Sequence, residues 1–379
     1  MQRRNDAHTN ILITGGSGFI GSHLADELLK HGYAVRVLDN LSPRVHGPER
    51  KRPDYLDPRV DLIVGDIRDP HAVQDALDGI DAVFHMAASV SMRQSMYEIE
   101  KYTSTNNLGT AVLLESLIRQ PVERLIVASS SSIYGEGLYT SFDGTEYQDI
   151  ERTREQLISG DWEARNPRGE VLMPLPTPET KRIMPRSIYA LSKFDQEQMS
   201  LMIGSAYGIS TVALRLFNVF GPRQGFSNPY SGMLAIYASR LLQGKPPQIP
   251  EDGLQQRDFV SVHDAVRGLR LALEVPDAAG RIINIGSGRA HSLRTAAEYL
   301  ALITGRAEIR PEITSASRMG EIRHCLCDIS LAREVLGYEP QVSFGDGLLE
   351  LVAWIEEKMA ADRKSVAGRK DLAATGLPI

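Results

Sequence analysis

Tyr189 and Lys193 lie four residues apart in the stretch SIYALSK, which has the pattern of a helix. Residues at positions i and i+4 are neighbours on one face of a helix. A nearby ammonium favours the phenolate and lowers the pKa of the phenol, so the tyrosine can act as a general base. Moving that pKa from about 10 to about 7 takes roughly 4 kcal/mol. The alternative is a solvated surface pair, and the rest of the chain distinguishes the two.

A glycine-rich turn near the N-terminus is the second chemical feature. The segment TGGSGFIG follows an apolar run and opens a helical pattern. Gly16, Gly18 and Gly21 have the G-x-G-x-x-G spacing, and Gly15 gives a G-x-x-G-x-x-G spacing with the last two. Such glycines let the backbone approach a pyrophosphate, and the helix N-terminus offers it unpaired N–H groups. The strand, turn and helix together predict a dinucleotide-binding site.

Polar and small residues follow the next three apolar runs. Asp39 stands 18 residues after the last motif glycine. A carboxylate there accepts hydrogen bonds from the adenosine ribose and repels a 2′-phosphate, so NAD is predicted rather than NADP. Asp66 in GDIRD is placed toward the adenine. Met86, Ala87 and Ala88 in HMAAS leave room for a cofactor against the backbone, in the crevice at the strand ends of an open α/β sheet.

Strand-like and helical segments alternate along most of the chain. This alternation predicts an α/β fold, a doubly wound parallel sheet with helices on both faces. Long helices are expected over 92–119 and 187–207. The predicted division is a cofactor domain over 9–216 to which 256–290 returns, a smaller C-terminal α/β substrate domain over 217–358, and a polar flexible tail over 360–379.

Residues 136–186 interrupt this alternation. The segment is rich in Glu, Asp, Pro and Thr and ends in PLPTPETKRIMPRS. A loop of this length inside a compact domain is usually functional or mobile. It is therefore predicted to be a surface insertion or a lid.

Composition excludes several functional classes. The net charge of −6 argues against nucleic acid or an anionic membrane as the main partner. Cys325 and Cys327 are the only cysteines, which fits a reducing cytoplasm and is too sparse for a structural zinc site. The start MQRRNDAHTN has no signal-peptide pattern, and no run of 18 apolar residues predicts a membrane span. We expect a cytoplasmic protein without a bound metal.

An ordered set of motifs resembles a known family. TGGSGFIGSHL, LDN, GDIRD, NNLGT, ASSSSIYG, SIYALSK and RLFNVFGPRQ are similar to the extended short-chain dehydrogenase/reductases, and within them to the nucleotide-sugar epimerases and dehydratases. The resemblance covers about residues 9 to 358. It implies a Rossmann-type fold, NAD as cofactor, a nucleotide-diphosphate sugar as substrate, and a homodimer formed through the helices near 93–119 and 187–207.

The resemblance also implies roles for individual residues. Ser130, Tyr189 and Lys193 correspond to the catalytic set, with Ser130 bonding the substrate oxygen that becomes a ketone and Ser129 and Ser131 as alternatives. Arg257 and Arg318 correspond to arginines that clamp the diphosphate, a role suited to a guanidinium fork. The cofactor set is Gly15, Gly18, Phe19, Ile20, Gly21, Asp39, Asn40, Asp66, Ile67, Met86, Ala87, Ala88, Asn106, Ser129, Tyr189, Lys193 and Phe217. The substrate set is Ser89, Ser131, Asn218, Arg223, Arg257 and Arg318.

Two segments favour one reaction within the family. The 4,6-dehydratases resemble TDEVYG where this chain has Ser131 and Ser132, which cannot supply the acid and base for loss of water. The segment GDWEARNPRGEVLMPLPTPE resembles bacterial dTDP-L-rhamnose 4-epimerases, many of which carry a C-x-x-C pair where this chain has Asn166 and Gly169. The local order of that loop is therefore in question.

The predicted reaction is NAD-dependent 4-epimerisation through a transient 4-ketone, interconverting dTDP-L-rhamnose and dTDP-6-deoxy-L-talose. Three alternatives stay open. The chain could be a 4-epimerase of another sugar, of the UDP-glucose or UDP-glucuronate type. It could be a keto-sugar reductase that exchanges cofactor at each turnover, or a binding or scaffold protein.

Overall fold

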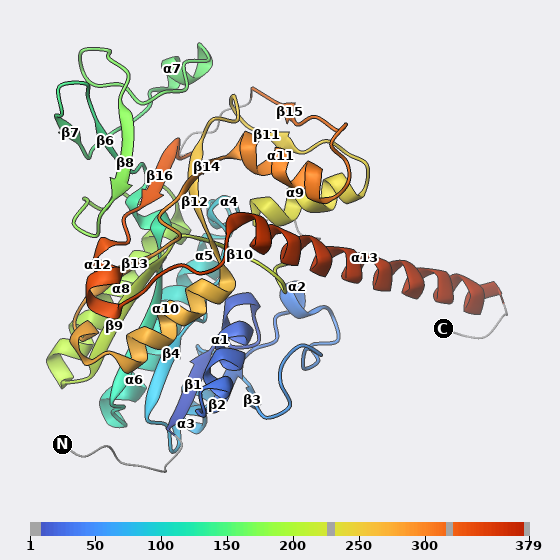
Figure 1. Cartoon of the computed structure of the whole chain (residues 1–379). Coiled ribbons are helices and arrows are strands. Elements are labelled where there is room, and N and C mark those ends of the chain that lie inside the picture. The colour runs from blue at the N-terminus through green and yellow to red at the C-terminus, as the bar shows by residue number, and fades with distance from the viewer. Residues whose placement is uncertain (1–8, 226–231, 316–320, 375–379) are drawn as a thin grey trace.

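Seven short apolar strands pair side by side in one sheet (Figure 1). The computed structural model describes residues 9–225, 232–315 and 321–374. The sheet order is β13-β9-β5-β4-β1-β2-β3, and every neighbouring pair is parallel. The order reverses at β1, the switch point of a doubly wound sheet, so the predicted α/β Rossmann-type class is confirmed. The strands are β1 (Asn10–Thr14), β2 (Ala34–Asp39), β3 (Asp61–Val64), β4 (Ala82–His85), β5 (Arg124–Ser130), β9 (Ser210–Leu216) and β13 (Ile282–Ile285).

Helices cover both faces of this sheet because both sides of its strands are apolar. In β1, Ile11 and Ile13 belong to one buried cluster and Leu12 belongs to the other. Helix α1 (Phe19–Lys30) packs against α10 (Val262–Glu274) on the first face, as Figure 1 shows in front of the sheet. The second face carries α3 (Pro70–Leu77), α6 (Gly109–Arg119) and α8 (Ile188–Tyr207). The shorter elements around the sheet are α2 (Pro43–His46), η3 (Pro276–Ala278) and α12 (Ser330–Leu336).

The two long predicted helices have different outcomes. Helix α8 forms nearly as expected, because Ser187 caps its first turn by accepting the Ala190 N–H at 3.1 Å and Gly208 ends it with a left-handed φ of 72°. The single helix expected over 92–119 is wrong. It is divided into α4 (Met92–Ser95), α5 (Ile99–Tyr102), a π-helical turn η1 (Thr103–Leu108) and α6.

A second sheet stands over the carboxyl ends of the first. Its order is β10-β12-β16-β8-β6-β7, with β14 paired to β12. Of the segment 256–290, α10 and β13 lie with the large sheet while β12 belongs to this second one. Three helices pack together beside it around a separate core. The elements are β10 (Asn218–Phe220), β11 (Gln248–Ile249), β12 (Gln256–Ser261), β14 (Ala290–Ser292), β15 (Glu312–Ile313), β16 (His324–Cys327), α9 (Met233–Leu242), α11 (Leu293–Ile303) and α13 (Phe344–Ala374).

The insertion over 136–186 contains regular structure rather than one long irregular loop. Strand β8 pairs in parallel with β16 and antiparallel with β6, so the insertion continues the second sheet. Tyr139, Ile150, Ala164 and Leu172 form a small core of its own. The strands are so short, and so rich in proline and polar residues, that their periodicity is weak in the sequence. The elements are β6 (Leu138–Thr140), β7 (Glu146–Tyr147), α7 (Arg154–Ile158) and β8 (Met173–Thr177).

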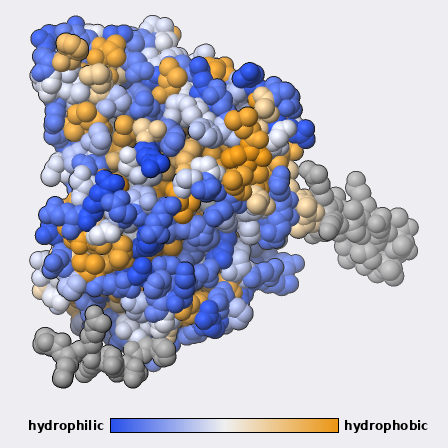
Figure 2. Space-filling model, viewed as in Figure 1, coloured by the Kyte–Doolittle hydropathy of each residue, from blue (hydrophilic) through white to orange (hydrophobic). Residues whose placement is uncertain are grey.

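The C-terminal part of helix α13 projects away from the rest of the molecule in Figure 1, while its first turns pack against α9 and α11. It continues to Ala374, so a helix occupies 360–374 where the sequence predicts a flexible tail. Alanine, arginine and lysine favour helix even where no apolar periodicity is present. The face of the molecule in Figure 2 is largely hydrophilic, with small separate hydrophobic groups. Within the described residues, no helix is both long and apolar enough to cross a bilayer.

Candidate active site

The glycine turn draws three strands and a helix together at the switch point. Gly15 has a φ of +70°, and its N–H donates to Leu38 O at 2.8 Å. A Cβ on Gly15 would lie 2.8 Å from Ala87 Cα, and one on Gly21 would lie 2.6 Å from Gly15 O. Gly18 is the N-cap of α1 and donates to Gly15 O at 3.2 Å. Larger residues at these positions would force the turn away from β4, so the close approach requires glycine.

The start of α1 and the end of β2 face the same turn. Phe19 and Ile20 open α1, and the first N–H groups of a helix have no acceptor within the helix. The Asp39 carboxylate is buried beside them and accepts the N–H groups of Ser17 at 3.0 Å and Leu41 at 2.9 Å. Donors for a pyrophosphate and a carboxylate for a ribose therefore lie side by side. This arrangement fits a dinucleotide held across the turn.

Asp66 and Asn40, both in the predicted cofactor set, lie together at the next strand ends. Arg68 donates to both Asp66 oxygens at 2.9 Å, and Asn40 Nδ2 donates to Oδ2 at 3.2 Å. The Arg68 guanidinium is the main reason that the pKa of Asp66 falls to about 2. Ile67 is buried, and a Cβ added to Gly109 would lie 2.6 Å from its Cγ2.

The segment after β4 is held by Asn106. Met86, Ala87, Ala88 and Ser89 are all half-buried. Asn106 Oδ1 accepts the Ser89 N–H at 2.7 Å, and Asn106 Nδ2 donates to Ser89 O at 3.2 Å. The same amide donates to Ser192 Oγ on α8 at 2.8 Å. Asn106 sits in the π-helical turn, a distortion that is frequent at functional sites. It joins β4, the π-turn and α8.

Ser130 and Tyr189 meet at the carboxyl end of β5. Ser130 caps the turn η2 (Ser131–Tyr134), with its Oγ accepting the Ser132 N–H at 3.2 Å and the Ser132 hydroxyl at 2.9 Å. Burial raises the pKa of the Tyr189 phenol, and a hydrogen bond with Ser130 offsets part of that rise. The Tyr102 ring packs edge-on against Tyr189, with centroids 6.5 Å apart.

The neighbouring serines are placed differently. The Ser129 hydroxyl is buried and donates to Glu197 at 2.6 Å, and that carboxylate also pairs with Arg215 at 2.8 Å. Ser131 is half-buried at the start of η2. Of the three serines the sequence left open, Ser130 is the one whose hydroxyl affects the pKa of Tyr189. Phe217 is a buried core residue whose ring centroid lies 6.2 Å from that of Tyr134.

Lys193 is buried below this contact. Its Nζ donates to Gln196 Oε1 at 2.7 Å. Burial lowers the pKa of Lys193 to about 7, against the opposing effect of Glu197. Gln196 and its neighbour His85 were not predicted as site residues. Gln196 lies three positions after Lys193, a spacing that could have placed it beside the lysine on the helix.

The predicted substrate residues have protein partners. Asn218 Nδ2 donates to Asp258 O at 2.8 Å. Arg223 pairs with Asp26 on α1 at 2.7 Å. Arg257 is buried and donates to the main-chain carbonyls of Gln256 and Arg323 at 2.9 Å and to that of Ile322. Arg318 lies outside the described residues.

Comparison with known proteins identifies the family. The sequence profile of the NAD-dependent epimerase/dehydratase family matches residues 11–156 and 168–286. The chain belongs to this family. The predicted resemblance is confirmed, and the cofactor of the protein is NAD.

Individual relatives span almost the whole chain. A dTDP-L-rhamnose 4-epimerase of Burkholderia thailandensis is 33% identical over 94% of this chain and 96% of the relative. The crystal structure of a UDP-glucose 4-epimerase with UDP-glucose from Thermotoga maritima has a TM-score of 0.76 and 31% identity, covering 93% and 100% of the two chains. A UDP-glucuronic acid 4-epimerase from Bacillus cereus, in complex with UDP-glucuronic acid and NAD, has a TM-score of 0.76 and 29% identity, covering 92% and 99%.

The insertion keeps local order at the place where a C-x-x-C pair was considered. Asn166 Oδ1 accepts the N–H groups of Arg168 at 2.9 Å and Glu170 at 3.0 Å. Gly169 takes a φ of +83° and donates to Asn166 O at 2.8 Å. This tight turn answers the question about the loop without a metal ligand from either position. In the part of the chain that the structure describes, no three His, Cys, Asp or Glu residues are grouped as a metal site would require.

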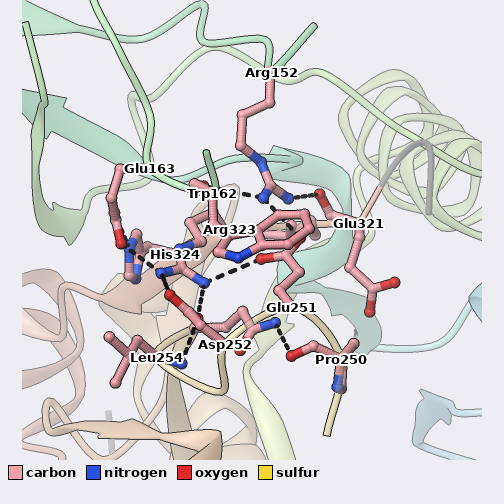
Figure 3. A network of polar contacts seen from close by, with 12 residues as sticks. Arg152, Trp162, Glu163, Pro250, Glu251, Asp252, Leu254, Glu321, Arg323 and His324 are labelled. Atoms are coloured by element: carbon pink, nitrogen blue, oxygen red, sulfur yellow. Dashed lines mark hydrogen bonds and ion pairs between the residues drawn. The ribbon is translucent and has the colours of Figure 1, made fainter. Parts of the chain in front are cut away.

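A network of buried charges fastens the insertion to the second sheet (Figure 3). Arg152 of the insertion pairs with Glu251 at 2.7 Å, and Arg323 pairs with the same carboxylate at 3.1 Å. Arg323 also bonds Glu163 of the insertion and Asp252, the latter at 2.7 Å. The main-chain carbonyl of Arg323 is one of the acceptors of Arg257. The network therefore holds the segment before β16, whose carbonyls accept from Arg257, the arginine predicted to bind the diphosphate.

Proposed function

We propose that the chain catalyses NAD-dependent 4-epimerisation of a nucleotide-diphosphate sugar through a transient 4-ketone, and that it interconverts dTDP-L-rhamnose and dTDP-6-deoxy-L-talose. One observation carries the proposal. Tyr189, in the first turn of α8, interacts with Ser130 at the carboxyl end of β5, and Lys193 lies one helical turn along α8. This end of the sheet also carries the glycine turn and Asp39.

The side chains of the site have separate roles in this reaction. Tyr189 takes the proton of the C4 hydroxyl as a general base, and Ser130 donates a hydrogen bond to the same substrate oxygen. The charge of Lys193 favours the Tyr189 phenolate. Bound NAD supplies a reversible hydride acceptor, so return of the hydride to the opposite face of the ring inverts C4. Asp39 and the N-terminus of α1 hold the adenosine ribose and the pyrophosphate.

The diphosphate of the substrate is assigned to Arg257 and Arg318, with Asn218 beside them. Arg257 is engaged with three carbonyl oxygens of the chain. It therefore has to exchange at least one of these acceptors for a phosphate oxygen when substrate binds. A charge-assisted bond to phosphate is stronger than one to a neutral carbonyl, which favours that exchange.

The site favours epimerisation over dehydration. Loss of water needs an acid and a base beside Ser130, and Ser131 and Ser132 stand there instead. Ser132 is also buried and donates its hydroxyl to Ser130. A keto-sugar reductase remains the second candidate, because the same Ser, Tyr and Lys would serve it. NAD that copurifies and turns over without exchange supports the epimerase, whereas a requirement for added reduced cofactor supports the reductase.

The choice of sugar is tested directly by incubation with dTDP-L-rhamnose. The proposal rests on the relative from Burkholderia thailandensis and on the resemblance in the insertion. Proton NMR should show the H4 coupling change as rhamnose is converted to 6-deoxy-talose. UDP-glucose and UDP-glucuronate serve as comparison substrates, because 4-epimerases of both sugars are similar in structure. Turnover of a UDP-sugar alone would keep the mechanism and reject this substrate.

We also infer that the chain forms a homodimer through α8 and the neighbouring π-turn and α6. Leu191 and Met202 are exposed on α8, 11 residues apart and so on one face of the helix. Ile99 on α5 and Leu108 in the π-turn are also exposed, and α6 and α5 both pack against α8. Pairing of two such surfaces would bury these side chains. Sedimentation should give a dimer for the natural chain and a monomer for the variant carrying Leu191→Glu and Met202→Glu.

A further inference from the structure

A line of buried polar side chains leads from Lys193 into the sheet. Gln196 accepts from Lys193 Nζ at 2.7 Å, and its Nε2 donates to Thr110 Oγ1 on α6 at 2.8 Å. Thr110 donates in turn to the main-chain carbonyl of Asn106 in the π-turn. Gln196 is completely buried.

We propose that Gln196 is a positioning residue for Lys193, holding its ammonium with a neutral acceptor and anchoring it through Thr110 to the π-turn. The inference rests on the proposed function for the catalytic role of Lys193. The contact itself does not depend on that role.

The orientation of the Gln196 amide follows from its neighbours. A lysine ammonium donates only, so the group facing Lys193 has to be the amide oxygen. The amide nitrogen then faces Thr110 Oγ1, and it also lies 3.4 Å from Ala87 O. In the reversed orientation the amide N–H groups would face the Lys193 ammonium, and the amide oxygen would face Ala87 O. One orientation alone satisfies both ends.

His85 fixes the other side of Thr110. Thr14 Oγ1 accepts the N–H groups of Met86 and Ala87, both at 3.2 Å, and lies 2.8 Å from His85 Nδ1. His85 Nε2 lies 2.8 Å from Thr110 Oγ1 and 3.0 Å from Gln196 Nε2. Thr110 Oγ1 is therefore held between His85 and Gln196 while it donates to the π-turn.

The charges around Lys193 show why a neutral partner matters. Glu197, on the same helix, is paired with Arg215 of β9, and Arg215 also donates to Tyr134 of η2. Burial lowers the pKa of His85 on β4 to about 3, so that ring is neutral at pH 7. Tyr189 lies one helical turn from Lys193, and Tyr102 of α5 packs against its ring.

A carboxylate in place of the Gln196 amide would have a different effect on the phenol. The carboxylate would hold the Lys193 ammonium equally well. Its negative charge would, however, cancel much of the electrostatic effect of the ammonium on the Tyr189 phenol. The amide positions the charge and leaves its effect on the phenol intact. This difference in charge, at constant size, makes the role of Gln196 testable.

The test compares Gln196→Glu with Gln74→Glu, a matched change on the exposed surface of α3. The Lys193 amine is titrated by NMR in cofactor-free protein, and the pH dependence of kcat is measured with the preferred sugar. In Gln196→Glu the pKa of Lys193 should rise by about one to three units, as expected for a carboxylate at contact distance. The rising limb of the kcat profile should move to higher pH. Gln74→Glu should change neither.

The outcomes separate this inference from the proposed function. An unchanged Lys193 titration in Gln196→Glu overturns the contact and the inference with it. A shifted titration with an unmoved rising limb supports the contact but rejects Lys193 as the group that tunes the general base. If Gln196→Glu does not fold, Gln196→Met, which has similar length and no acceptor, should lower the pKa of Lys193. A titration like that of the natural chain in this variant also overturns the inference.

Discussion

Arg152 and Glu251 form an ion pair at 2.7 Å with both side chains buried, and this pair joins the insertion to the loop before β12. Arg323, the residue directly before β16, contacts the same carboxylate. The buried positive charges of Arg152 and Arg323 are therefore both compensated in part by the Glu251 carboxylate. A segment held in this way is a fixed part of the second sheet, in contrast to a freely opening lid.

Removing one charge from this group should be costly. Glu251→Gln leaves Arg152 and Arg323 buried with less compensation, and breaking a buried pair from one side costs about 3–5 kcal/mol. We expect that loss in the free energy of unfolding from urea denaturation. The control is Arg165→Met, which breaks a partly exposed pair with Asp161 at 2.6 Å. Exposed ion pairs contribute about 0–1 kcal/mol to stability. If both variants lost the same free energy of unfolding, the buried network around Glu251 would stabilise the protein no more than an exposed pair, which would contradict this prediction.

The same network predicts how stability responds to acid. Hydrogen bonds from His324 and then Arg323 lower the pKa of Glu163 to about 2, from 4.5 in the unfolded chain. Between these values the unfolded state binds more protons, so the stabilisation is present above about pH 4.5 and is lost as the pH falls toward 2. Glu163→Gln should flatten this part of the curve of unfolding free energy against pH. Glu155→Gln, an exposed change on α7, should leave its slope unaltered.

Tyr189→Phe tests the general base. The variant keeps the ring that packs against Tyr102 and removes the hydroxyl that contacts Ser130. We expect turnover to fall by at least about 10²-fold, the usual scale for a general acid/base, with NAD binding and the thermal midpoint little changed. Tyr207→Phe, an exposed position at the end of the same helix, is the control. Turnover of Tyr189→Phe near that of the natural chain would remove Tyr189 from the mechanism.

Local sequence predicts the strand, glycine turn and helix that carry the cofactor motifs, because each signal there lies within one such unit. The glycine spacing, Asp39 and the i, i+4 pair of Tyr189 and Lys193 all have this property. The strand order then brings them together, since the carboxyl ends of neighbouring parallel strands share one edge.

Features that depend on contacts between distant segments could not be predicted in the same way. The pairing of β8 with β16 joins Pro176 to Leu326, 150 residues apart, and no local periodicity in the insertion indicates it. Two of the carbonyl partners of Arg257, those of Ile322 and Arg323, come from the segment directly before β16. The break between α4 and α5 was also missed, because the apolar spacing continues across it.

Asp39 should make the enzyme prefer NAD over NADP. Its carboxylate is fixed by the N–H groups of Ser17 and Leu41, so it is held beside the glycine turn, where a 2′-phosphate would meet a negative charge. Two arginines that follow Asp39 in the sequence are already engaged, because Arg44 pairs with Glu98 and Arg50 donates to Asn40 O.

Calorimetric titration of both cofactors measures this preference. We expect NAD to bind at least about tenfold more tightly, since 1.4 kcal/mol corresponds to a factor of ten. Asp39→Asn keeps the size of the side chain and removes its charge. It should therefore reduce the ratio of the NAD affinity to the NADP affinity, mainly because NADP binds more tightly. Asp61→Asn, at an exposed position on β3, is the matched control. Equal affinities for the two cofactors in the natural chain would show that the Asp39 carboxylate does not face the ribose.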